Sequence, residues 1–164
     1  MSLDAFAVRR VVRPEECDEL GHANNVEYLR WILDAASAHW TWLRTHGPAA
    51  GVEELAWVVL RHEVDYLAQA FPGDEVLVYT WVPACTAMTC ERCAEIERVS
   101  DGAILARSVS NYCVIDLATG RPRRLSESIR AAIGGPPMVK RDRTARAPTP
   151  RPPLVAEADW RAAE

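Results

Sequence analysis

The stretch NNVEYLRWILDAASAHWTWLRT, residues 24–45, decides the fold class of this chain. Its apolar side chains recur every three or four residues, which predicts a helix with one buried stripe. That stripe comprises Val26, Leu29, Ile32 or Leu33, Ala36, Trp40 and Leu43. Asn24 is a favoured N-cap residue and Gly47-Pro48 a favoured stop. In the middle, the small residues 35–38 leave room for another backbone, as a helix in the palm of a curved sheet needs.

Outside this helix the apolar period changes to two, which is typical of strands. The valine-rich segment Phe6–Arg13 precedes the helix and ends at Pro14. Trp57–Tyr66 follows it, and simple alternation predicts one face made of Val58, Leu60, His62, Val64 and Tyr66. Three more strands are expected at Glu75–Val82, Cys90–Val99 and Ala103–Ile115, with turns at 71–74 and Asp101-Gly102. One strand, one long helix and a run of antiparallel strands indicate an α+β fold.

The end of the chain has a different composition. Leu125–Ile133 is expected to form a short closing helix capped by Ser126. Beyond Gly135 the sequence is rich in proline and arginine, which excludes a central strand and leaves little to bury. We therefore divide the chain into a domain of residues 1–135 and a C-terminal extension of residues 136–164. The extension is interpreted as a tail, or alternatively as an arm over a partner subunit anchored by Leu154, Val155 and Trp160.

Composition restricts the class of protein. A chain of 164 residues suits one domain, and a net charge of -4 with interspersed acids and bases argues against a nucleic-acid partner. No apolar run is long enough to insert into a membrane, and no leader precedes the first strand, so the sequence predicts a cytoplasmic protein. Five cysteines without a secretion signal predict reduced thiols. Cys90 and Cys93 lie three apart in an expected strand and point to opposite faces, so no metal site is predicted.

The polar residues before the helix point to chemistry. Asp18 is followed by Gly21-His22-Ala23-Asn24-Asn25 and then by Tyr28-Leu29. This block resembles the hotdog-fold acyl-CoA thioesterases of the 4-hydroxybenzoyl-CoA thioesterase type. The resemblance continues in the turn Phe71–Glu75 and in residues 114–122, and it covers roughly residues 6–133.

The resemblance implies a fold, an activity and partners. In such proteins an antiparallel sheet wraps around one long central helix, and two sheets usually join edge to edge in a homodimer, with tetramers common. The acyl-CoA cleft lies between subunits. The implied reaction is hydrolysis of an acyl-CoA or acyl-carrier-protein thioester to free acid and thiol, without a metal or an organic cofactor.

The implied catalytic residues are Asp18, His22 and Asn25. A helix N-terminus leaves backbone N–H groups unpaired and carries positive potential, so it can polarise a thioester carbonyl. By family correspondence that N–H belongs to Asn25. Asp18 then acts as a general base for water or as a nucleophile, and His22 orients the loop or the substrate. The expected substrate-binding residues are Gly21, Asn24, Tyr28, Arg121 and Arg123.

Other interpretations compete with this one. Asp18 and Asn24 are also residues that ordinarily bond nearby backbone, and the arginines 121 and 123 also suit a solvated turn. A non-catalytic acyl-thioester binding or assembly module would use the same cleft without turnover. Plant-type carrier-protein thioesterases have a similar block, but Leu20 stands where they have a second polar residue. His62 and Glu63 are left out of the catalytic set, and the acyl chain itself is not fixed by the sequence.

Overall fold

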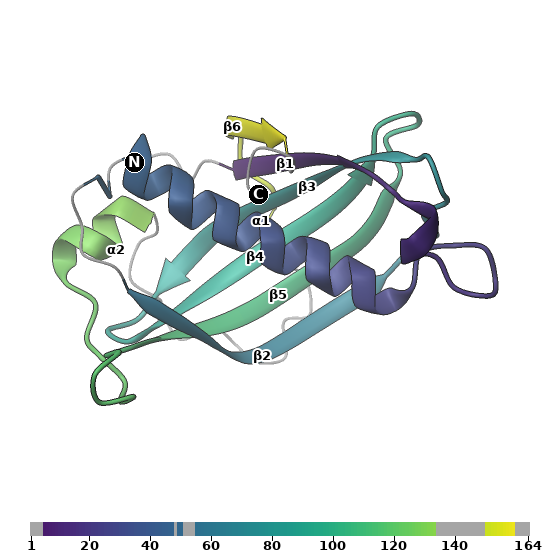
Figure 1. Ribbon diagram of the computed structural model, residues 1–164. Helices are drawn as coiled ribbons and strands as arrows, with labels where there is room; N and C mark the ends of the chain where they lie inside the picture. Colours follow the sequence, from purple (N-terminus) through teal and green to yellow (C-terminus); the bar gives the residue numbers. More distant parts are fainter. Residues whose placement is uncertain (1–4, 48, 51–54, 134–149, 160–164) are drawn as a thin grey trace.

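A six-stranded sheet curves around one long helix (Figure 1). The computed structural model describes residues 5–47, 49–50, 55–133 and 150–159. The strand order is β2-β5-β4-β3-β1-β6, antiparallel except for the parallel pair β1 and β6. The elements are β1 (Ala5–Val11), the 3-10 turn η1 (Pro14–Glu16), α1 (Asn25–Thr45), β2 (Ala56–Tyr66), β3 (Glu75–Cys85), β4 (Thr89–Arg98), β5 (Ile104–Ile115), α2 (Glu127–Ile133) and β6 (Leu154–Asp159). This is the predicted hotdog architecture.

Helix α1 lies across the concave face of the sheet (Figure 1). Asn24 caps it, since its side-chain oxygen accepts the Val26 N–H at 3.0 Å. The buried stripe is rotated from the predicted one, because Val26 is 59% exposed. Its buried members are Tyr28, Trp31, Ile32, Ala35, Ala36, His39 and Leu43. The polar side chains among them were missed because the spacing was counted on apolar residues alone.

Strand β2 departs from the predicted alternation. The register with β5 shifts between Val59 and Arg61, so Leu60 sits in a bulge. A bulge inserts one extra residue and reverses which side chains share a face. Trp57 and Val59 therefore face α1 together with Tyr66, and the single face predicted from Val58 to Tyr66 is wrong for its first half.

Strand β6 comes from the C-terminal extension. Residues 5–9 of β1 pair with residues 154–159, so a segment interpreted as a tail completes the sheet. Proline-rich composition excluded only a central strand, and β6 is an edge strand, where such sequence is tolerated. Trp160, the third suggested anchor, lies outside the described residues, as does most of the extension. The domain boundary at residue 135 stays a prediction.

The cysteines are also different from expectation. Cys85 and Cys90 are register partners in the β3–β4 pair and form a disulfide, so the prediction of reduced thiols is wrong for these two. Cys93 belongs to the same strand as Cys90 but is not its partner. In the described parts of the chain, no helix is long and apolar enough to cross a membrane.

Candidate functional site

The loop between η1 and α1 carries Asp18. Its backbone is closed by two hydrogen bonds: the Asp18 N–H donates to the His22 carbonyl at 3.0 Å, and the Gly21 N–H donates to the Asp18 carbonyl at 3.0 Å. The Asp18 carboxylate accepts the Leu20 N–H at 2.9 Å and retains partial exposure. Gly21 has φ of 78°, the left-handed region that favours glycine. The loop therefore holds a solvent-accessible carboxylate in a fixed turn.

Helix α1 begins next to this loop. Asn24 uses its side chain to cap Val26 and its carbonyl to accept the Glu27 N–H at 2.9 Å. The N–H of Asn25, the first helical residue, has no hydrogen-bond partner among the described residues. An unpaired N–H at a helix start is a donor for a developing negative charge. The Asn25 side chain is exposed, and its carbonyl accepts the Tyr66 hydroxyl at 3.2 Å.

His22 lies between the acid and the helix. Its Nδ1 is 3.9 Å from the Asp18 Oδ1, too long for a hydrogen bond but close enough for one water or a small rotation to join them. Its ring meets Phe71 edge to face at 6.5 Å. Phe71 begins the turn that resembled the family motif, so that turn packs against the loop that carries the acid.

Tyr28 has a structural position. It is 2% exposed, and its hydroxyl donates to the Ala68 carbonyl at 3.1 Å and accepts the Ala70 N–H at 2.8 Å. Both hydrogen-bonding functions of the hydroxyl are thus used to tie α1 to the segment before β3.

A buried acid beside the loop was missed in the sequence. Glu16 is paired with Arg10, accepts the Trp31 indole N–H at 3.1 Å, and accepts the Arg13 N–H at 2.8 Å. Burial raises its pKa, but these hydrogen bonds and the Arg10 charge outweigh it, so the pKa of Glu16 is lowered overall. The Glu16 carbonyl also accepts the Asn24 N–H at 2.9 Å. Glu16 therefore holds both the loop and the helix start in place from their buried side.

The remaining candidates, Arg121 and Arg123, lie at the opposite end of the molecule from the start of α1. Arg121 and Arg123 follow β5, whose last residue Ile115 pairs with Ala56 at the start of β2. They lie far from the start of α1 within one chain.

His62, left out of the catalytic set, contacts the Ser110 hydroxyl at 2.7 Å, and burial lowers its pKa.

Two of the cavities formed by the described residues flank helix α1. The first, which we call the inner cavity, has a volume of about 340 Å³ and lies between the second half of α1 and strands β2 to β5. The second, of about 780 Å³, lies between α1 and the β1–β6 edge. Asp18, His22 and Asn25 line neither of them. Leu33, the first α1 residue at the inner cavity, is about 12 Å along the helix from Asn25 at about 1.5 Å per residue.

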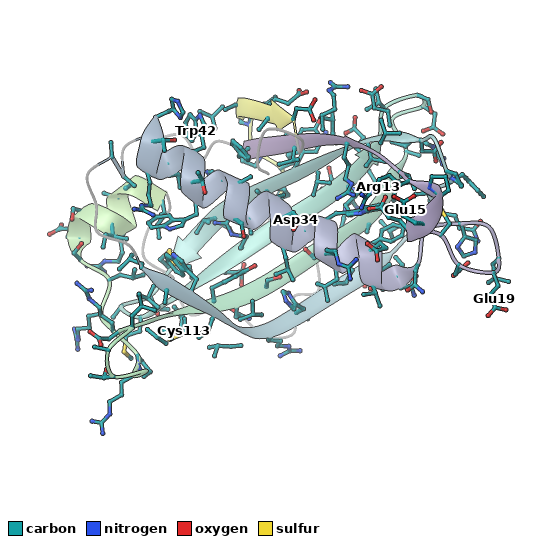
Figure 2. The ribbon with its side chains drawn as sticks, viewed as in Figure 1. Arg13, Glu15, Glu19, Asp34, Trp42 and Cys113 are labelled. Carbon is teal, nitrogen blue, oxygen red and sulfur yellow. A yellow bond between two sulfur atoms is a disulfide. The ribbon has the colours of Figure 1, made fainter. Side chains whose placement is uncertain are left out.

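The loop projects away from both cavities. Figure 2 shows Glu19 at its tip, beyond the end of α1 that the loop leads into. Asp34 lies on the flank of α1 next to β1, where it lines the larger cavity and its carboxylate is 3.8 Å from the Arg10 guanidinium (Figure 2). The candidate catalytic groups and the inner cavity are thus on the same molecule but at different positions along α1.

Comparison with known proteins gives a consistent result. The family description "Thioesterase-like superfamily" matches residues 12–133, which include the loop, the helix and strands β2 to β5. No curated protein sequence matches the chain.

Solved structures share the fold. A predicted thioesterase from Bacillus stearothermophilus is 29% identical with a TM-score of 0.68, covering 79% of this chain and 93% of that one. A thioesterase from Thermus thermophilus, solved with coenzyme A and zinc, is 28% identical with a TM-score of 0.64, covering 77% and 90%. A 1,4-dihydroxy-2-naphthoyl-CoA thioesterase from Synechocystis is 21% identical with a TM-score of 0.67, covering 79% and 95%, and so compares in fold alone.

Proposed function

The chain belongs to the thioesterase-like superfamily, and we propose that it hydrolyses an acyl-CoA thioester to the free acid and coenzyme A. Water supplies the oxygen that bonds to the acyl carbon, the C–S bond breaks, and the thiolate takes up a proton. The observation that carries this proposal is the pairing of a loop carboxylate, Asp18, with a helix start whose first N–H has no partner among the described residues.

Each part of the loop has a role in this reaction. The Asn25 N–H, with the positive end of the helix dipole, stabilises the oxyanion that forms on the thioester carbonyl. Asp18 takes a proton from the attacking water, or attacks the carbonyl itself to give an anhydride that water then opens. His22 orients Asp18. Trapping with hydroxylamine separates the two roles. If an anhydride forms, hydroxylamine captures its acyl group as acyl hydroxamate, and the rate of acyl transfer from the thioester to Asp18 does not change. Direct attack by water does not give this result.

The acyl group binds in the inner cavity of a second copy in this proposal. Among the described residues, strand β2 is an open sheet edge with exposed Leu60 and Tyr66, and open edges pair readily with another strand. If two β2 strands pair antiparallel, the Trp57 end of one lies beside the Tyr66 end of the other. Because Tyr66 contacts Asn25, the helix start of one subunit then adjoins the inner cavity of its partner.

The same pairing places the basic turn that carries Arg121 and Arg123 near the partner's helix start. Ala56 pairs with Ile115, so the segment of Arg121 and Arg123 lies near the β2 end that meets the partner's helix start. Arginine forks match phosphate oxygens, which supports a contact with the nucleotide phosphates of coenzyme A. Gly21 and Asn24 shape the loop against the thioester.

Steady-state hydrolysis of short, medium, long and aromatic acyl-CoAs tests the activity. Asp18→Asn keeps the size of the side chain and removes its charge, so we expect kcat to fall about 100-fold to 10,000-fold. Thiol reagents also react with the protein, which has a partly exposed Cys17, so each rate is corrected with an enzyme-only blank. An Asn variant with unchanged kcat on every substrate would rule out the assigned role of Asp18.

The Asn25 backbone can be tested separately from its side chain. Asn25→Pro removes the N–H at a position where proline is favoured, and Asn24 already has φ -62° and ψ 142°, as a residue before proline requires. We expect about a 100-fold to 1,000-fold loss of kcat with the melting temperature retained. Asn25→Ala, the matched control, keeps the N–H and most of the activity. Equal losses in both variants would assign the role to the side chain instead.

A binding or assembly module is the second candidate, because the same loop and cavity would hold a thioester without hydrolysing it. Thermal stabilisation by acyl-CoAs with no release of thiol would favour it. Parallel assays with acyl-carrier-protein esters decide which carrier is used.

A further inference from the structure

A buried arginine lies at the wall of the inner cavity. Arg92 belongs to β4, is 9% exposed, and points into the space under α1 that also contains the cavity. Among the described residues that line this cavity there are two arginines, Arg44 and Arg92, and no aspartate or glutamate. The rest of the lining is largely apolar and aromatic, with Trp40, Trp57 and Val82 among its members. The cavity is therefore electropositive in a low-dielectric setting.

The Arg92 guanidinium has only neutral partners. Its Nη1 donates to the Thr80 hydroxyl at 2.9 Å and to the Nδ1 of His39 at 3.1 Å. Burial, together with the Arg92 charge, lowers the pKa of His39 to about 3, so this ring is a neutral acceptor. Burial also lowers the pKa of Arg92 to about 10, which leaves the guanidinium charged at neutral pH. No described carboxylate pairs with it, and Nε and Nη2 have no hydrogen-bond partner among the described residues.

Two further donors beside it are also unsatisfied. The Tyr112 hydroxyl is buried without a partner among the described residues, and its ring lies 5.9 Å from the Arg92 guanidinium carbon. The Trp57 indole N–H, from β2 at the same cavity, is likewise without a hydrogen bond in the described part of the chain. Buried polar groups are normally hydrogen-bonded, and a buried charge without a counterion is costly. Three such donors around one cavity indicate that a ligand supplies the acceptor.

We propose that the acyl group of the substrate ends in a carboxylate that binds Arg92, so that the substrate is an ω-carboxyacyl thioester. This inference rests on the proposed function and adds the substrate class to it. A carboxylate matches the planar fork of an arginine with two parallel hydrogen bonds. At about 30 Å³ per water-sized group, 340 Å³ holds about 11 non-hydrogen atoms, which suits an acyl group but not coenzyme A itself.

Matched pairs of substrates test the proposal. Each pair has the same chain length and differs in its far end: succinyl-CoA with butyryl-CoA, adipoyl-CoA with hexanoyl-CoA, suberoyl-CoA with octanoyl-CoA, and 4-carboxybenzoyl-CoA with 4-methylbenzoyl-CoA. We expect the wild type to prefer the carboxylate of at least one pair by about 10-fold to 100-fold in kcat/KM, the range for a hydrogen bond to a charged group. A preference for the uncharged member of every pair would overturn the proposal.

The variant Arg92→Met assigns the preference to this residue. Methionine fills a similar volume, and because no described carboxylate pairs with Arg92, its removal leaves no described charge without its counterion. The preference should disappear while the rate on the uncharged esters stays within about threefold, and Arg92→Lys should recover part of it by keeping the charge. Arg107→Met, on an exposed β5 arginine paired with Glu95, is the matched control and should keep the wild-type ratio. An equal loss on both members of each pair would show a structural role only and overturn the proposal.

Binding without turnover separates this inference from the proposed reaction. In the Asp18→Asn background, the ω-carboxyacyl esters should raise the melting temperature more than their uncharged partners, and Arg92→Met should abolish the difference. Equal shifts for both members of every pair would overturn the substrate class even if hydrolysis is observed. A larger shift with no hydrolysis by the wild type would instead refute the proposed function and retain the Arg92 site.

Discussion

Three buried ionisable side chains, Glu16, His39 and Arg92, connect α1 to the sheet. Each is held by neighbours from other elements: Glu16 by Arg10 and Trp31, His39 by a stacked Phe6 ring at 5.2 Å, and Arg92 by His39 and Thr80. Such groups are costly to bury and are tolerated only with hydrogen bonds. Replacing them one at a time therefore reports on separate parts of the interior.

Replacing Glu16 tests the support behind the loop. Glu16→Gln keeps the size of the side chain but removes the negative charge beside Arg10, and we expect the free energy of unfolding to fall by about 3 kcal/mol, as for a broken buried ion pair. Urea unfolding measures this. Glu15→Gln is the control, because Glu15 is exposed and lies 3.5 Å from Arg13 in a surface pair worth less than about 1 kcal/mol. Equal effects in both variants would contradict the buried role of Glu16.

Because His39 is buried, we expect the free energy of unfolding to depend on pH. Its pKa is lowered from 6.5 to about 3, chiefly by burial and then by Arg92, so below pH 6.5 the unfolded chain binds a proton that the folded chain does not. Stability therefore falls as the pH drops from 6.5 towards 3, by about 2 kcal/mol at pH 5. His62, whose pKa burial also lowers, contributes in the same direction.

The variant His39→Asn isolates this contribution. Asparagine places an oxygen where Nδ1 accepts from Arg92, and it does not titrate. The difference in unfolding free energy between pH 7 and pH 5, measured with denaturant at one protein concentration, should shrink by about 2 kcal/mol. An unchanged difference would mean that His39 is not held neutral by burial.

At the scale of elements, the two edges of the sheet differ. On one side β6 covers β1, while on the other side the outer edge of β2, a strand of 11 residues, is unpaired in the described chain. Exposed apolar side chains gather on β2 and just after it, at Val59, Leu60, Tyr66 and Leu67. A long exposed edge with apolar side chains is a pairing surface. We therefore assign the dimer contact to β2.

Charge placed on β2 tests this assignment. Leu60 is 62% exposed, and Leu60→Glu would bring like charges together across a two-fold axis, so we expect monomers by sedimentation velocity and a loss of most activity. Leu154→Glu puts the same charge on exposed β6 as a matched control and should leave the dimer intact. Dissociation by Leu154→Glu alone would move the interface to the other edge and revive the arm over a partner subunit.

The elements were predictable to different degrees, for physical reasons. The helix and the long strands were predicted because periodicity and caps are local signals, and Ser126 caps α2 as expected, accepting the Ile129 N–H at 3.2 Å. The β2 bulge was not predicted, because alternation assumes an unbroken ladder.

Glu16 and Arg92 were missed because a charged residue within an element is ordinarily counted as exposed. Their roles depend on partners distant in sequence. The role of the loop with Asp18 stays a prediction, and it rests on the family resemblance.

At the scale of the whole molecule, the chain returns to its first strand. Before β6, Arg151 crosses towards Tyr79 of β3, with its guanidinium carbon 3.9 Å from the ring centroid, and pairs with Glu97 at 2.8 Å. Arg9 of β1 is paired with Glu157 of β6 at 2.6 Å. These contacts join β6 and the residues before it to the domain.

Removing this segment tests its contribution. A chain ending at residue 149 loses the β6 pairing and the contacts of Arg151, and we expect the melting temperature to fall by about 5 °C or more, corresponding to about 1 to 2 kcal/mol. Activity at low temperature should persist, because the loop with Asp18 and the inner cavity involve other elements. Arg151→Ala separates the side-chain contacts from the strand pairing. An unchanged melting temperature after truncation would show that β6 adds nothing to the domain.

The parallel pair of β1 and β6 has a consequence for biosynthesis. Ala5 meets Leu154, so β1 keeps one edge uncovered during translation until β6, far later in the sequence, has also been made. A nascent edge strand of this kind recruits unwanted neighbours, especially when several ribosomes translate one message. A chain that terminates before β6 would retain that exposed edge, whereas a chain that includes β6 covers it with its own strand.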